Sequence, residues 1–171
     1  YMDVHHPYAP SEPYQQAFRD DLVSDRRAIQ LRRKMLEEPD AVTDTELQTL
    51  IDLYDGEIKY FDHHAGRLIE EVQELWGDET LIGFTADHGD EFLDHGMFSH
   101  YDKFYDELIH VPLLFSVDDA GGNHQELVEL LDLAPTLVDY ADVPSPDGFL
   151  GPSLRDLFAA GSWKKDVCCI E

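Results

Sequence analysis

The polar segment from Asp87 to Glu91 has side chains that can bind a metal ion. It follows the apolar run 80–84 and places an aspartate, a histidine and Gly89 in succession. A carboxylate oxygen beside an imidazole nitrogen suits a divalent cation, and glycine permits the sharp turn that lets both side chains face one centre. Open α/β sheets bind ligands beyond the carboxyl ends of their strands, so the pattern indicates a metal site at Asp87 and His88. An exposed acidic turn is the alternative.

Further motifs accompany this segment in a fixed order along the chain. They are His5-His6-Pro7-Tyr8, the loop from Asp94 to Glu107, Val111-Pro112-Leu113-Leu114 and Leu131-Asp132-Leu133-Ala134-Pro135-Thr136-Leu137. Together with Thr85-Ala86-Asp87-His88-Gly89 they resemble the sulfatases of the alkaline phosphatase superfamily over roughly residues 1 to 158. The resemblance implies an α/β fold, alkaline-phosphatase-like, with a mixed and mostly parallel central sheet between helical layers. It also implies metal-dependent hydrolysis of a small-molecule or carbohydrate sulfate ester.

The resemblance assigns roles to particular side chains. Asp87 and His88 match the residues that coordinate the metal, which polarises the sulfate oxygens. Oxygen ligands favour Ca²⁺, with Mg²⁺ possible, and an imidazole ligand leaves room for Mn²⁺ or Zn²⁺. His5 matches the family's His-x-Pro histidine, which faces the sulfate and leaving-group oxygens as a donor or general acid. His6 takes that role if the register differs by one.

The chain departs from the family pattern at the sulfate-binding lysine. Many sulfatases carry a lysine four residues before the tyrosine that corresponds to Tyr105, and that offset lands on Tyr101. The nearest cations are His100 and Lys103, of which we favour His100 as the catalytic group. Since the same scaffold handles phosphate esters and phosphonates, this departure keeps a phosphoester or phosphonate hydrolase open as the alternative function.

The family's nucleophile segment is missing from the sequence. The family uses a formylglycine made within Cys/Ser-x-Pro-x-Arg, whereas Cys168 and Cys169 lack this context and read as free thiols in a short last strand. An acidic pair that supplies further metal ligands is also absent. Residues 1–171 are therefore predicted to form the C-terminal portion of a sulfatase-type catalytic domain, inactive alone, with the formylglycine expected upstream. A non-catalytic domain is the alternative.

The composition limits the class of partner and habitat. The chain has 37 acidic and 12 basic residues among 171, a formal net charge of -25. Nucleic acid is disfavoured because its basic footprint is absent, and no apolar stretch is long enough for a membrane span. The dispersed acidity fits a halophilic protein in a high-salt cytoplasm or medium, where charge repulsion is screened. The basic cluster of Arg26, Arg27, Arg32, Arg33 and Lys34 is predicted to be a solvated helix face, with a phosphate-binding patch as the alternative.

Hydrophobic periodicity predicts a helix-rich α/β arrangement. The predicted helices cover residues 13–37, 43–76, 127–140 and 155–158, and the predicted strands cover 81–86 and 111–117. Several polar residues near the motifs receive structural roles: Asp90, Glu91 and Asp94 as solvated loop residues, and Tyr105, Asp106 and Glu107 as loop anchors. His63 and His64, inside the predicted helix 43–76, are expected to be surface or boundary groups. His95 is predicted either to orient the loop or to contact the substrate.

Overall fold

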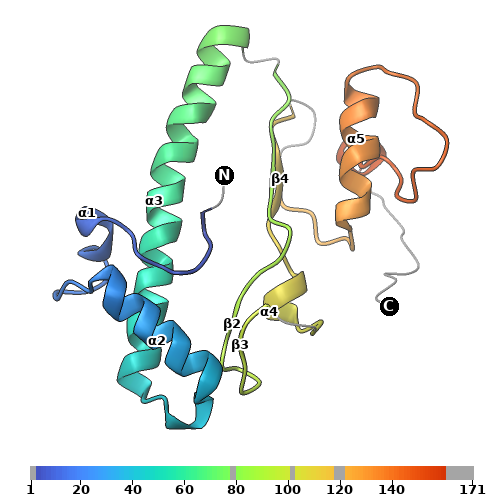
Figure 1. The fold of residues 1–171 in the computed structure, drawn as a ribbon. Coiled ribbons are helices and arrows are strands. Elements are labelled where there is room, and N and C mark those ends of the chain that lie inside the picture. The colour runs from blue at the N-terminus through green and yellow to red at the C-terminus, as the bar shows by residue number, and fades with distance from the viewer. Residues whose placement is uncertain (1–2, 78–79, 101–102, 118–121, 161–171) are drawn as a thin grey trace. The chain divides into compact units, whose positions relative to one another are not determined.

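The computed structural model describes residues 3–77, 80–100, 103–117 and 122–160 (Figure 1). By their contacts, the described residues up to 77 and from 88 to 109 form one compact unit. The described residues 80–87 and 110–160 form a second unit. Each unit has its own packing and is treated by itself below.

The long helix α3, Asp44–Trp76, is the main element of the first unit (Figure 1). It begins with a capping box, in which Thr43 accepts a hydrogen bond from the Glu46 backbone and the Glu46 side chain accepts one from the Thr43 backbone. These bonds satisfy N–H groups that have no partner within a helix. The helix ends at Gly77, whose φ of 84° favours glycine. This helix was predicted at these bounds and is confirmed.

The predicted single helix over residues 13–37 is wrong, because the chain forms two helices there. They are α1, Glu12–Gln15, and α2, Asp25–Glu37. The buried Gln15 side chain donates to the carbonyls of Pro10 and Val23 and accepts from the Val23 backbone N–H, at 2.9 to 3.1 Å. These bonds stabilise a non-helical connection, and Ser24 then caps α2. Apolar spacing alone does not reveal such a side-chain bridge.

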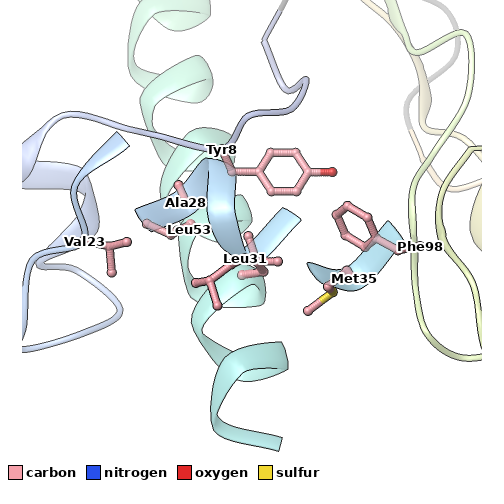
Figure 2. Close-up of a cluster of buried hydrophobic side chains, with 8 residues drawn as sticks. Tyr8, Val23, Ala28, Leu31, Met35, Leu53 and Phe98 are labelled. Atoms are coloured by element: carbon pink, nitrogen blue, oxygen red, sulfur yellow. The ribbon is translucent and has the colours of Figure 1, made fainter. Parts of the chain in front are cut away.

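The core of the first unit joins α2 and α3 to the amino-terminal segment and to a short hairpin (Figure 2). Leu50 and Leu53 of α3 are fully buried, and Leu31 and Met35 of α2 pack against them. The cluster consists of Tyr8, Val23, Ala28, Leu31, Met35, Leu50, Leu53 and Phe98. Because Tyr8 and Phe98 belong to it, the core fixes two of the segments that carry the predicted site residues.

The hairpin consists of β2, Glu91–Phe92, paired antiparallel with β3, Phe98–Ser99. Glu91 is only 1% exposed, and its Oε1 accepts hydrogen bonds from the backbone N–H groups of His95 and Met97 at 2.7 and 3.3 Å. The prediction of a solvated Glu91 is therefore wrong, because its carboxylate satisfies the turn's backbone donors. Asp94 is exposed, as predicted. The short helix α4, Asp106–Ile109, completes this unit.

The second unit contains the strands β1, Gly83–Thr85, and β4, Leu113–Phe115. Both strands were predicted, but their pairing is antiparallel and β1 is only partly buried. In an antiparallel pair, the chain leaves the first strand and enters the second at the same end of the sheet. A parallel pair would need a crossover connection to the opposite end. Within the described ranges both sheets are antiparallel, so the predicted parallel pairing is not seen there.

The helical part of the second unit follows the predicted motif around Pro135. A short 3-10 turn, η2, Leu130–Asp132, leads into α5, Leu133–Tyr140, and α6 covers Arg155–Ala160. Asp132 is fully buried and accepts a hydrogen bond from the Glu129 backbone at 2.8 Å, while Thr136 Oγ1 accepts one from the Leu154 backbone at 2.9 Å. The motif thus has a structural role here. The predicted strand at Cys168 and Cys169 lies outside the described residues.

Candidate active site around Asp90

Four histidines of the first unit gather near one another. His5 and His6 come from the amino-terminal segment, His88 precedes β2, and His100 follows β3. The ring centroids are 4.2 Å apart for His5 and His6, 5.8 Å for His6 and His100, and 4.0 Å for His88 and His100. The fold therefore brings together predicted site residues that are far apart in the sequence.

The carboxylate of Asp90 lies within this cluster. Its side chain is 5% exposed, and its Oδ1 is 2.8 Å from Nδ1 of His100. Its Oδ2 accepts a hydrogen bond of 2.5 Å from the Tyr8 hydroxyl. The prediction of a solvated Asp90 is therefore wrong. The carboxylate can stay buried because each of its oxygens has a hydrogen-bonding partner.

Tyr8 connects the hydrophobic core to this polar group. Its ring is 1% exposed and packs edge-on against Tyr54 and Phe98. Burial, together with the charge of Asp90, raises the pKa of Tyr8 well above its ordinary value, so the phenol remains a hydrogen-bond donor. A hydroxyl held by a packed aromatic ring gives the Asp90 carboxylate a defined position.

His100 is oriented from one side of its ring. Asp90 accepts from Nδ1–H, and the Ser99 hydroxyl lies 3.3 Å from the same nitrogen. The preceding Ser99 is buried and has a φ of 78°, a backbone conformation that non-glycine residues rarely adopt. An acceptor at Nδ1 leaves Nε2 as the nitrogen that can face a ligand.

His6 forms a close contact with an arginine of α2. Its Nε2 lies 2.6 Å from Nη2 of Arg32. Burial, and then the positive charge of Arg32, lower the pKa of His6 to about 4. His6 is therefore neutral at pH 7. Arg32 was predicted to lie on a solvated helix face, but it is half-buried because α2 turns this side chain toward the amino-terminal segment.

A candidate metal group is present within the cluster. One ligand atom each from His88, Asp90 and His100 lies within 4.8 Å of the others. Two imidazoles and one carboxylate are ligands that divalent transition metals accept. His88 was predicted as a ligand, and its Nδ1 lies 2.9 Å from the Gly89 carbonyl. Asp87, the other predicted ligand, has an exposed side chain and belongs to the second unit.

The remaining predicted site residues differ in their surroundings. His5 is exposed at the edge of the cluster, with its Nδ1 2.8 Å from the His6 carbonyl and its ring 5.7 Å from that of His100. Lys103 is exposed. His95 stacks on Tyr105 at 3.6 Å and lies 3.5 Å from Glu107, contacts that suit a loop-orienting role.

Three residues of this site were not predicted from the sequence: Tyr8, Arg32 and Asp90. Tyr8 and Asp90 are separated by 82 positions, and Arg32 and His6 by 26. The sequence offered a signal for two of them, since Tyr8 ends the motif His5-His6-Pro7-Tyr8 and Asp90 lies in the polar segment from Asp87 to Glu91. His63 and His64, by contrast, lie in α3, where their rings contact Tyr14 and Tyr60.

Imidazoles around a buried carboxylate can bind a metal ion and can donate hydrogen bonds to an oxyanion. The model of the family described as Sulfatase matches residues 1–143. The chain therefore belongs to the sulfatase family.

Individual known proteins agree with this membership. An arylsulfatase of Clostridium perfringens (strain 13 / Type A) is 34% identical over an alignment of 113 residues, which covers 61% of this chain and 23% of that protein. The phosphonate monoester hydrolase from Silicibacter pomeroyi superposes with a TM-score of 0.66 at 27% identity, covering 97% of this chain and 35% of that one.

A second similar structure was solved in complex with its substrate D-glucosamine-2-N,6-O-disulfate. It has a TM-score of 0.64 and 26% identity, covering 79% of this chain and 28% of that chain. These likenesses confirm the predicted alkaline-phosphatase-like α/β fold. The chain spans about a quarter of the length of the curated relatives and about a third of the solved ones. Within the described residues, no helix is long and apolar enough to cross a membrane.

Proposed function

We propose that the protein carrying this chain hydrolyses sulfate esters with the help of a divalent metal ion. Family membership supports the reaction class, and one structural observation supports the site. That observation is the pair of hydrogen bonds by which Tyr8 and His100 engage the buried Asp90 carboxylate, beside His88.

The residues present fit a metal ion. We propose Asp87 and His88 as ligands, as the sequence predicts, and Asp90 as a residue that positions His100. Both oxygens of Asp90 already accept hydrogen bonds, which suits an orienting carboxylate behind a histidine. When bound, the metal would act as a Lewis acid toward the sulfate oxygens. Calcium would need further oxygen ligands, whereas coordination by both His88 and His100 would favour Mn²⁺ or Zn²⁺.

The chain's other groups supply hydrogen bonds and a proton. With Asp90 accepting from its Nδ1–H, His100 in its imidazolium form can donate Nε2–H to the oxygens on which negative charge develops. His5 is exposed at the edge of the cluster, where it can donate a proton to the leaving-group oxygen. Lys103 is the alternative cation for the sulfate. The formylglycine nucleophile is expected in a segment upstream of residue 1.

A matched pair of substrates tests this proposal. The complete protein is assayed with an aryl sulfate and an aryl phosphonate monoester that share one leaving group, before and after chelation of divalent metal. A sulfatase turns over the sulfate ester preferentially, loses activity on chelation, and regains it with one particular ion. Turnover that is indifferent to chelation would contradict the metal dependence.

Phosphonate or phosphate ester hydrolysis is the second candidate function. Two observations favour it: the similarity to the Silicibacter pomeroyi hydrolase and the histidine at position 100, near the place of the sulfatase lysine. In the same assay, preferential turnover of the phosphonate ester would replace the first proposal with this one. For the sulfatase reaction we propose a small-molecule or carbohydrate sulfate as substrate and a high-salt environment as the setting.

A further inference from the structure

Arg32 has unusual surroundings for an arginine in so acidic a chain. Four other arginines, Arg19, Arg27, Arg33 and Arg155, each form an ion pair with a carboxylate. Arg32 is half-buried, and among the described residues it forms no such ion pair. Its Nε is buried without a hydrogen-bond partner in the described part of the chain. A desolvated cation with an unused donor is costly unless a ligand compensates it.

The contact with His6 determines which His6 nitrogen carries the proton. A guanidinium can only donate, so Nε2 of His6 must accept the 2.6 Å bond from Nη2 of Arg32. The neutral ring therefore holds its proton on Nδ1. This Nδ1 is also buried and has no hydrogen-bond partner among the described residues. A protonated Nδ1 cannot coordinate a metal, so the nitrogen is a donor that needs an acceptor.

We propose that Arg32 and His6 form an oxyanion-binding pair, in which Arg32 Nε–H and His6 Nδ1–H donate to the oxygens of a sulfate, phosphate or carboxylate group. Two buried donors and a guanidinium charge match an acceptor-only anion. The pair lies beside the proposed reaction centre, since the His6 ring is 5.8 Å from His100 and 4.2 Å from His5.

The identity of the anion that this pair binds rests on the proposed function, because the anion is taken to be part of the ester substrate. The pair could receive oxygens of the reacting ester group itself, or those of a second anionic substituent on the same substrate. Both sources present anionic oxygens to the pair. They differ in which substrates lose kcat/KM when Arg32 is replaced. Binding of inorganic sulfate does not require turnover, so it tests the pair even if the protein hydrolyses a different ester.

The first experiment measures the affinity of the complete protein for inorganic sulfate by calorimetry at constant ionic strength. Arg32→Gln should weaken binding about 10- to 100-fold, the size expected for hydrogen bonds to a charged group. Arg33→Gln is the matched control, because the neighbouring Arg33 is exposed and pairs with Glu37. His6→Asn, which keeps a donor near the position of Nδ1, should bind more tightly than His6→Ala. Thermal unfolding of each variant checks that it folds.

The second experiment compares kcat/KM for a monosulfated substrate and for one with an additional anionic group. If Arg32→Gln lowers both values equally, the pair binds the reacting group. If only the doubly anionic substrate suffers, the pair binds the second group. A folded Arg32→Gln variant that matches Arg33→Gln in sulfate affinity and in both kcat/KM values would overturn the proposal. Weakened sulfate affinity in a protein that hydrolyses no sulfate ester would uphold the pair and refute only the proposed function.

Discussion

Replacing Asp90 with asparagine tests whether this carboxylate positions His100. Asparagine is nearly isosteric but has only one acceptor oxygen, and its NH₂ group must face either His100 or Tyr8. If it faces His100, Nδ1 of the imidazole must accept, and the proton moves to Nε2. If it faces Tyr8, the phenol loses the acceptor that it reaches at 2.5 Å. Either arrangement disturbs a group whose side chain is 5% exposed, so water compensates poorly.

The expected size of the Asp90→Asn effect follows from the role of Asp90 in orienting His100. Loss of a carboxylate that orients a functional histidine typically costs about 10- to 100-fold in metal affinity or activity. We therefore expect Asp90→Asn to lower kcat/KM of the complete protein by about that factor. Tyr8→Phe removes one of the two hydrogen bonds and keeps the packed ring, so its effect should be smaller.

The assay combines steady-state kinetics with the metal content of each purified variant. Asp94→Asn is the control, because Asp94 lies in the same loop and is exposed. If Asp90→Asn leaves kcat/KM within the range of Asp94→Asn, the positioning role is refuted. If it abolishes metal binding while Asp87→Ala does not, Asp90 is itself a ligand and the proposed ligand pair is wrong.

Further outcomes follow from the same site and from the composition. Asp87→Ala should lower metal content and activity together, as metal analysis of the purified protein would show. His100→Ala should reduce kcat about 10²-fold or more, the size of one lost electrostatic contact; if Lys103→Ala is the damaging change instead, Lys103 is the sulfate-binding cation. His5→Ala should impair esters with poor leaving groups more than activated aryl esters, measured as the slope of log kcat/KM against leaving-group pKa. Leu53→Ala should destabilise the first unit by about 2–5 kcal/mol in denaturant unfolding. With a net charge of -25, the melting temperature should fall as the Debye length grows from ~3 Å at 1 M salt to ~30 Å at 0.01 M; a salt-independent value would contradict the halophilic interpretation.

Elements governed by neighbouring residues could be predicted from the sequence. The helix α3 was predicted because its apolar spacing and the Thr43 capping box are local features. The strands β1 and β4 were predicted from short apolar runs, and the family followed from motifs in a fixed order. These features depend on spacings of a few residues along the chain, which sequence patterns record directly.

Features that depend on contacts between distant residues were decided by the tertiary structure. Asp90 in isolation is a polar loop residue, and it is buried because Tyr8, 82 positions away, brings a hydroxyl to it from within a hydrophobic core. Arg32 belongs to a charged helix face by periodicity, yet folding places it against His6. A charge can remain out of water only where the fold provides partners, and such partners come from segments whose proximity no local pattern encodes.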